Sequence, residues 1–248
     1  MPILHLSNPA AYTEKERLYL DVRRREGRVL SDEQLLELPD VTQPPALARE
    51  WRWRKRSFQR LDAYLHRRFH KSPIRILDLG CGNGWMSNLL AADPLRTVTA
   101  MDLNETELEQ GSRVFRRDNL QFVYGDVLKD EWPEEPFDVI VLAASVQYFP
   151  DLGELIARLK KLLAPDGEIH LLDSNFYPDA AAAEAARQRT KAYYEQVGVP
   201  EMAGFYHHHL KQEVLACGAK NLNAGLWMTL LRRVKYEGPF SWWRIGYK

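Results

Sequence analysis

An apolar segment that runs into a glycine-rich turn is the feature that most constrains the fold of this chain. Residues 76–79 are Ile-Leu-Asp-Leu, and glycines follow at Gly80, Gly82 and Gly84. Glycine is required where a backbone turns sharply or lies in contact with a ligand, because a side chain there would collide. The segment therefore predicts a buried strand, a ligand-binding turn and a helix that begins near Trp85.

Short apolar segments continue to alternate with amphipathic ones after this turn. We expect strands over residues 74–79, 97–102, 120–123, 137–143 and 168–173. A leucine-rich helix separates the last two strands, and the turn Pro165-Asp166-Gly167 ends it. Such alternation predicts an α/β fold of the Rossmann-like, doubly wound kind, with a mostly parallel sheet. Two further strand candidates around Gly238-Pro239 are expected to form an antiparallel C-terminal pair.

Residues 1–72 are predicted to form an N-terminal helical cap on a core of residues 73–248. Two spacings in this part fit a capping box, in which side chains bind the first free backbone donors of a helix. They are Thr13 with Glu16, and Ser31 with Gln34. Gly27 and Pro39 are placed to end these two helices, and apolar residues at helical spacing predict a third helix from Trp51 to Phe69.

Residues 174–212 interrupt the alternation of strands and helices, and we expect them to overhang the carboxyl ends of the strands as a substrate cap. An alanine-rich helix is followed by Phe205-Tyr206-His207-His208-His209. Three successive helical residues point about 100° apart, so they cannot all face one ion, and no metal site is predicted. A single histidine acting as a base or substrate contact stays open beside simple packing or exposure.

The spacing of the glycines also discriminates between cofactors. Trp85 stands where the dinucleotide fingerprint requires its third glycine, which argues against NAD. Residues 78–84, Asp-Leu-Gly-Cys-Gly-Asn-Gly, instead resemble the first motif of class I S-adenosylmethionine-dependent methyltransferases, in the small-molecule, type 11-like branch. The resemblance continues through Asp102, Asp126, the strand at 137–143 and the turn at 162–168.

This resemblance implies S-adenosylmethionine as cofactor, S-adenosylhomocysteine as product and a seven-stranded sheet. The glycine turn would pack beside the methionine part of the cofactor. Asp102 would accept hydrogen bonds from the ribose hydroxyls, and Asp126 would accept one from the adenine amino group. The cofactor-binding residues it implies are Asp78, Gly80, Cys81, Gly82, Asn83, Gly84, Asp102, Leu103, Asp126, Val127 and Ala143.

Methyl transfer from a sulfonium is an in-line displacement, which an enzyme favours by holding the acceptor atom behind the methyl group in a water-poor pocket. A general base is needed only where the acceptor must lose a proton. Our candidates for catalysis are Tyr148, His207 and His208, with Asp173 at the end of the fifth strand as a further position.

Charge and absent motifs bear on the acceptor. The chain has 34 basic and 34 acidic residues, so its overall charge does not favour nucleic acid as a partner. The arginines and tryptophans of residues 49–60 are consistent with a solvated helix face, a nucleic-acid surface or a lid over the cofactor's methionine end. The Asp/Asn-Pro-Pro-Tyr/Phe motif of amino-methylating DNA enzymes does not follow the fourth strand, where residues 143–148 are Ala-Ala-Ser-Val-Gln-Tyr. Neither cysteine follows a proline, as the nucleophile of cytosine-5 methyltransferases would.

The sequence therefore favours a methyltransferase that acts on oxygen or nitrogen of a small-molecule acceptor. A non-catalytic S-adenosylmethionine-binding regulator and a protein or RNA methyltransferase stay as alternatives, because fold alone does not decide function. No signal peptide and no apolar segment of about 18 residues is found, so we expect a cytoplasmic protein that has no membrane partner. Cys81 and Cys217 are expected to be free thiols.

Overall fold

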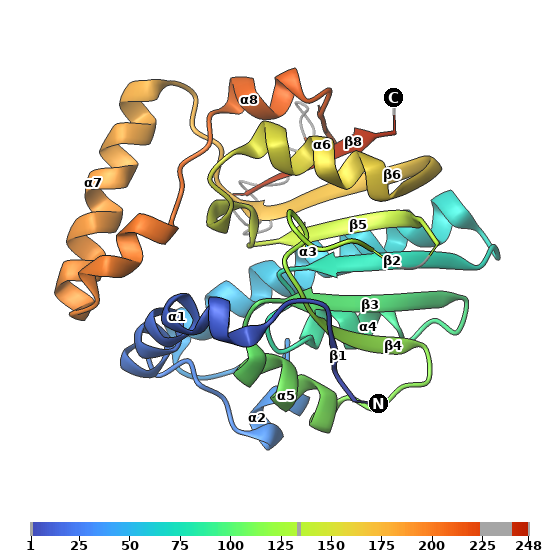
Figure 1. Ribbon diagram of the computed structural model, residues 1–248, viewed down its shortest axis with the longest axis horizontal. Coiled ribbons are helices and arrows are strands. Elements are labelled where there is room, and N and C mark those ends of the chain that lie inside the picture. The colour runs from blue at the N-terminus through green and yellow to red at the C-terminus, as the bar shows by residue number, and fades with distance from the viewer. Residues whose placement is uncertain (1, 133–134, 224–239, 248) are drawn as a thin grey trace.

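Eight strands form one sheet in the part of the chain that the computed structural model describes, residues 2–132, 135–223 and 240–247 (Figure 1). The strands are β1 (Leu4–His5), β2 (Ile74–Leu79), β3 (Arg96–Asp102), β4 (Leu120–Tyr124), β5 (Phe137–Ala143), β6 (Leu163–Ser174), β7 (Lys220–Asn221) and β8 (Ser241–Gly246). Their order across the sheet is β1-β4-β3-β2-β5-β6-β8-β7. Strands β1 to β6 are parallel, and β8 is antiparallel to β6 and β7. The doubly wound, mostly parallel sheet with antiparallel C-terminal strands is confirmed.

The expected count of seven strands is wrong, because the described residues already include eight, of which the two edge strands β1 and β7 were not predicted. Leu4 and His5 pair with Val123 and Tyr124 of β4. A strand of two residues is too short to show an alternating pattern, which is why the sequence did not indicate it. The second predicted tail strand is β8, whereas the first falls in residues 224–239, outside the described residues.

The helices cover both faces of the sheet. They are α1 (Thr13–Arg25), α2 (Asp32–Leu36), α3 (Pro45–Phe69), α4 (Trp85–Leu90), α5 (Glu105–Val114), α6 (Leu152–Leu162), α7 (Ala180–Val197) and α8 (Lys211–Ala216), with 3-10 turns η1 (Pro9–Ala11), η2 (Val146–Tyr148) and η3 (Pro200–Phe205). On one face, residues of α2, α3, α4 and α5 pack on side chains such as Ile76, and on the other, residues of α6 and α8 pack on side chains such as Leu77. Because adjacent strand residues point to opposite faces, a central strand such as β2 is apolar on both.

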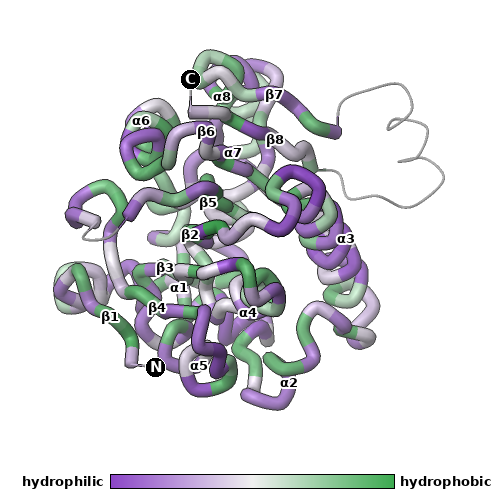
Figure 2. Tube along the Cα trace, turned by 90° about the vertical axis from the view of Figure 1, so that its right-hand side faces the viewer, coloured by the Kyte–Doolittle hydropathy of each residue, from purple (hydrophilic) through white to green (hydrophobic). Residues whose placement is uncertain are grey.

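Helix α3 lies along one face of the sheet, as Figure 2 shows, with hydrophilic residues along much of its length. It begins at Pro45, earlier than the predicted Trp51, because proline is well suited to the first turn of a helix. Leu61 and Leu65 are buried in the same cluster as Ile76 of the sheet. A buried leucine contributes roughly 1.5–3 kcal/mol, so this helix is a substantial part of the core.

The helix ends predicted for the N-terminal part are partly correct. The capping box of Ser31 and Gln34 is confirmed, and Gly27, with φ of 66°, follows the end of α1. The box of Thr13 and Glu16 is wrong, because Thr13 is already the first helical residue. Its hydroxyl donates to the Pro9 carbonyl oxygen, and Glu16 instead accepts hydrogen bonds from Thr106 of α5.

Helix α1 and the segment that contains α7 and η3 lie together beyond the carboxyl ends of the strands (Figure 1). Leu18 and Val22 of α1 pack on Tyr194, Val199 and Met202 in a cluster separate from the two sheet cores. This cluster joins two segments that are far apart in the sequence. It lies over the carboxyl ends of the strands, where the glycine turn is also found.

Candidate functional site

The glycine turn between β2 and α4 is held by backbone hydrogen bonds. The Gly80 N–H donates to the carbonyl oxygen of Met101 at 2.8 Å, and the Gly84 N–H donates to that of Cys81 at 3.0 Å. Gly82 and Gly84 have φ of 55° and 74°, which residues with a side chain rarely adopt. A glycine at each position therefore lets the chain reverse between the end of β2 and the start of α4.

A cavity of about 770 Å³ opens beside this turn, at the carboxyl ends of β2, β3, β4 and β5, and α1 and α3 cover it. Its volume is in the range of small-molecule sites. Most of the predicted cofactor-binding residues line it: Gly80, Cys81, Gly82, Asn83, Asp102, Leu103, Asp126, Val127 and Ala143. The structure therefore gathers the ends of these four strands around one space.

Two predicted cofactor residues do not line the cavity. Asp78 is buried below the turn and accepts a 2.6 Å hydrogen bond from the Ser87 hydroxyl, and burial raises the pKa of Asp78 to about 6. Gly84 faces the ring of Phe122, where a Cβ atom would lie 2.5 Å from a ring carbon. Both residues position the turn from beneath, which is a structural use of the motif.

The Asp102 carboxylate lies at the floor of the cavity. It accepts hydrogen bonds from the backbone N–H groups of Gly82 at 2.7 Å, Leu103 at 2.7 Å and Asn104 at 3.0 Å. Burial raises its pKa, while these donors oppose that change. A carboxylate has about four acceptor positions, so Asp102 both fixes the turn and keeps acceptor capacity for a ligand hydroxyl.

Asp126 connects the cavity to the N-terminal segment. Its carboxylate accepts hydrogen bonds from the Tyr12 hydroxyl at 2.8 Å and from the Leu128 N–H at 3.0 Å. Lys129 Nζ lies 3.3 Å from the same carboxylate and 3.1 Å from the Tyr12 oxygen. The N-terminal segment therefore covers the part of the cavity that Asp126 lines.

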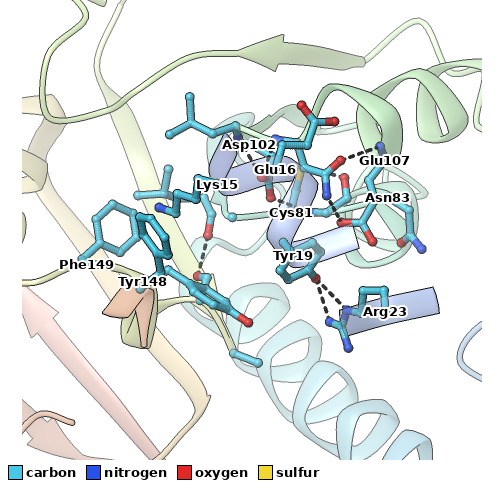
Figure 3. Close-up of a pocket in the computed structure, with 18 of the residues that line it drawn as sticks. Lys15, Glu16, Tyr19, Arg23, Cys81, Asn83, Asp102, Glu107, Tyr148 and Phe149 are labelled. Atoms are coloured by element: carbon cyan, nitrogen blue, oxygen red, sulfur yellow. Dashed lines mark hydrogen bonds between the residues drawn. The ribbon is translucent and has the colours of Figure 1, made fainter. Parts of the chain in front are cut away.

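Helix α1 contributes five polar residues to the cavity lining that sequence reasoning missed: Glu14, Lys15, Glu16, Tyr19 and Arg23. Lys15, Tyr19 and Arg23 face Asp102 and Asn83 across the space, as Figure 3 shows. Their spacing of four residues places them along one side of a helix, and this is the signal that could have indicated them. Tyr19 is held in place, because its hydroxyl oxygen accepts two hydrogen bonds from Arg23, at 2.9 and 2.7 Å.

Glu107 of α5 is another cavity residue that the sequence did not single out. Its carboxylate accepts a 3.3 Å hydrogen bond from the side chain of Asn104, and a Cβ atom on Gly82 would lie 3.0 Å from it. Burial raises the pKa of Glu107 to about 7, and Arg23 partly opposes this change. Together with Asp102 and Asp126, this residue makes the sheet side of the cavity acidic.

The catalytic candidates separate into two groups. Tyr148 and His207 line the cavity. The backbone N–H of His207 donates to the backbone carbonyl oxygen of Gln147 at 2.7 Å. His208 does not line it, and its Nε2 lies 3.0 Å from the Thr190 hydroxyl. The histidines belong to a segment without helical structure, so neighbouring side chains point in different directions. No cluster of metal-binding side chains occurs among the described residues.

The remaining candidates lie at the margins. Asp173 accepts a 2.5 Å hydrogen bond from Ser57 and lines a neighbouring cavity, not this one. Of the basic residues predicted on α3, Arg54 lines the cavity and stacks 5.2 Å from the ring centre of Trp51. Cys81 and Cys217 are free thiols, as predicted.

These groups fit a nucleoside-containing cation. Gly80 and Gly82 line the cavity, and the carboxylates of Asp102 and Asp126 can accept from hydroxyl and amino groups. The residues present therefore fit S-adenosylmethionine.

Comparison with known proteins gives the same assignment. Residues 76–167 match the family model of a methyltransferase domain. The 27-O-demethylrifamycin SV methyltransferase of Amycolatopsis mediterranei is 28% identical over 142 residues, covering 56% of this chain and 52% of that protein. The malonyl-acyl-carrier protein O-methyltransferase of Halalkalibacterium halodurans is 37% identical over 112 residues, covering 43% of this chain and 41% of that protein. This chain thus spans about half the length of the curated relatives it matches.

A solved structure shares the fold over nearly the whole chain. The plantazolicin methyltransferase BpumL has a TM-score of 0.57 and 17% identity, with 97% of this chain and 100% of that one covered. No described helix is both long and apolar enough to cross a bilayer. Residues 76–167 therefore carry a methyltransferase domain, and the chain is similar to the class I methyltransferases, whose cofactor is S-adenosylmethionine.

Proposed function

We propose that this protein transfers the methyl group of S-adenosylmethionine to an oxygen or nitrogen atom of a small-molecule acceptor. The observation that carries this proposal is the convergence of the glycine turn, Asp102 and Asp126 on one cavity that also contains Tyr148 and His207. The cofactor residues and the candidates for acceptor chemistry thus share a single covered space.

The cofactor roles follow from the lining of this cavity. The backbone from Gly80 to Asn83 would lie beside the methionine part of the cofactor. Three of the roughly four acceptor positions of Asp102 already bind backbone N–H groups. The position that is left would accept a hydrogen bond from a ribose hydroxyl. Asp126 would accept from the adenine amino group, with Leu103, Val127 and Ala143 as neighbouring walls.

When bound, S-adenosylmethionine supplies an electrophilic methyl group, and the chain's residues position the acceptor and exclude water. Tyr148 and His207 lie on the side of the cavity that η2 and residues 174–212 form. Burial lowers the pKa of His207, so its imidazole is neutral at pH 7 and can accept a proton from an acceptor hydroxyl or amine. Tyr148 can orient that acceptor through its hydroxyl.

The cover is also part of the proposal. Within the N-terminal cap of residues 1–72, α1 supplies the polar lid, while residues 174–212 supply Met202, Phe205 and His207. Both segments lie at the carboxyl ends of the strands, where ligands bind in open α/β sheets. An in-line displacement gains most from such enclosure, because the reacting atoms are held together away from water.

The relatives support a small acceptor. Both curated relatives are named for the transfer of a methyl group, one to demethylrifamycin and one, by O-methylation, to a malonyl group on a carrier protein. These names favour oxygen as the methylated atom, although the proposal covers nitrogen too. Nucleic acid is not part of the proposal, since the formal net charge is zero.

Incubation with methyl-labelled S-adenosylmethionine and fractionated cell extract tests the proposal. We expect label in low-molecular-mass products, and no transfer by a Gly82→Val variant used as a control. Label only in protein or RNA would replace the proposed acceptor by a macromolecule. Cofactor binding without any transfer would instead support a regulatory protein.

A further inference from the structure

A second, more polar cavity of about 480 Å³ adjoins the cofactor cavity. Arg23, Arg28, Arg54, Ala144 and Tyr148 line both spaces, so the two communicate at the end of β5. The second cavity extends away from the glycine turn, toward α7. Its position is that of a compartment for the part of an acceptor that lies beyond the transferred methyl group.

The charge of this cavity is strongly one-sided. Among the described residues, the charged side chains that line it are four arginines, at positions 23, 28, 54 and 189, and one glutamate, Glu26. Glu50 lies behind Arg28 and Arg54 and accepts from them at 2.7 and 2.8 Å. With Glu50 included, the cationic groups still outnumber the anionic ones two to one. This excess is local, because the chain has a formal net charge of zero.

The arginines are fixed in place yet keep donors for a ligand. Arg23 uses Nε and Nη2 on the Tyr19 oxygen, and Arg54 uses the same two atoms on Glu50. Within the described part of the chain, Arg54 Nη1 makes no hydrogen bond, and Arg23 Nη1 makes only an ion pair with Glu26 Oε2 at 3.5 Å. An arginine whose fork is already oriented loses little side-chain entropy when it binds an anion.

Glu26 offsets part of the positive charge of the cavity, whereas Arg189 has no counter-ion among the described residues. The buried Oε2 atom of Glu26 lies 3.5 Å from Arg23 Nη1 and 3.4 Å from Arg28 Nε, and it has no hydrogen-bond partner among the described residues. Arg189, on α7, makes no hydrogen bond or ion pair with any of the residues that the structure describes. Donors on several sides of the cavity therefore point to an anionic ligand.

We propose that this cavity binds a carboxylate or phosphate group of the methyl acceptor, a placement that rests on the proposed methyltransferase function. Planar guanidinium groups match both anions through paired hydrogen bonds. Tyr177, Tyr194 and Tyr206 also line the cavity, and Tyr206 contacts Tyr148 edge to face with ring centres 5.9 Å apart. These rings suit the flat, apolar part of such an acceptor.

Calorimetric titration of the full chain, saturated with S-adenosylhomocysteine, tests this proposal with three probes. They are benzoate, inorganic phosphate and benzamide, the last being an uncharged analogue of benzoate. We expect one anion to bind at least tenfold more tightly than benzamide, and the anion that binds identifies a carboxylate or a phosphate site. Equal binding of benzamide and the anions, or no anion binding, would overturn the proposal.

Variants locate the bound anion. We expect Arg23→Gln and Arg189→Gln each to weaken binding of that anion about tenfold or more, because each removes a charged donor. Arg187→Gln is the matched control, since Arg187 lies on the same helix and pairs with Glu184 but does not line the cavity. Unchanged anion binding in both cavity variants would overturn the assignment.

The same titrations separate this proposal from the proposed function. If the protein fails to bind S-adenosylhomocysteine, the methyltransferase proposal fails, and anion binding is then measured on the protein alone. If S-adenosylhomocysteine displaces the anion, the arginines bind the cofactor's own carboxylate and the acceptor site is overturned. Simultaneous binding of both ligands supports two adjoining sites.

Discussion

The Tyr12 hydroxyl donates a 2.8 Å hydrogen bond to the Asp126 carboxylate and thereby joins the N-terminal segment to the end of β4. The two residues are 114 positions apart, and Lys129 contacts both. Strand β1 pairs with the same β4, so the segment before α1 is anchored twice along one strand. The cover of the proposed cofactor site thus depends on a residue that is itself a proposed cofactor ligand.

Substitution of Tyr12 by phenylalanine tests this link. We expect Tyr12→Phe to weaken S-adenosylhomocysteine binding by roughly threefold to tenfold, because one hydrogen bond to a charged group is lost from the cover. Calorimetry on Tyr12→Phe, Asp126→Asn and the double variant forms a double-mutant cycle. Coupling near zero would show that Tyr12 does not act through Asp126.

The glycine turn gives a graded prediction. Gly82→Val should abolish S-adenosylmethionine binding, because φ of 55° is strained for valine and its side chain enters the cavity toward Glu107. Asp102→Ala should weaken binding by roughly tenfold to a hundredfold, since backbone contacts to the ligand persist. Gly246→Val is the control, because a Cβ atom there meets nothing within 4 Å. Unchanged affinity in both site variants would reject the cofactor site.

Glu107 provides a prediction for pH. Its folded pKa of about 7 lies above the ordinary value of 4.5, so the folded protein holds this proton more tightly than the unfolded chain does. Stability therefore falls as pH rises from about 4.5 to 7, and the full penalty is present at pH 8. We expect Glu107→Gln to be more stable than the wild type at pH 8 by about 1–2 kcal/mol, a figure discounted because the side chain faces a cavity.

Thermal unfolding at pH 5 and pH 8 measures this effect. The advantage of Glu107→Gln should largely disappear at pH 5, where the wild-type carboxyl is protonated in the folded state. Glu109→Gln is the control on the same helix, because Glu109 is exposed. An equal gain at both pH values would contradict the assigned cause.

The sheet and the turn could be predicted because their signals are local. An apolar strand such as β2, a glycine turn and a Pro-Asp-Gly helix stop each appear within a few residues. Asp78 and Gly84 show the limit of a motif, because both belong to it and yet support the turn from below. Spacing in a motif does not separate ligand contact from structural support.

A cap could be predicted, but not which of its residues line the cavity, because these contacts join distant parts of the chain. Lys15, Tyr19 and Arg23 gain their place only when α1 crosses over the strand ends, and no local pattern gives that crossing. Strand β1 is missed for a related reason, since two residues pair with β4 through tertiary placement.

Neighbouring histidines offer an internal comparison for acceptor chemistry. We expect His207→Gln to lower kcat at least tenfold and to remove the acidic limb of the pH profile, because His207 lines the cavity and burial lowers its pKa. His208→Gln should change kcat less than twofold, since His208 lies beside Thr190 outside the cavity. Steady-state kinetics with a small acceptor decides, and equal losses in both variants would exclude His207 as the base.

The last prediction concerns the apolar cluster that joins α1 to α7 and η3. Leu18 is 3% exposed and packs with Tyr194, Val199 and Met202, apart from both faces of the sheet. Leu18→Ala should cost about 2–4 kcal/mol of local packing, so α1, α7 and η3 should open without unfolding of the sheet. Hydrogen exchange should therefore rise in these three elements and stay unchanged in β2 and β5, while methyl transfer falls because water reaches the cavity. Leu155→Ala, in the α6 core, is the control that should raise exchange in the sheet. A uniform rise in hydrogen exchange over all elements of the Leu18→Ala variant would contradict local opening. Full activity with α1, α7 and η3 open would show that this cover is not needed for catalysis.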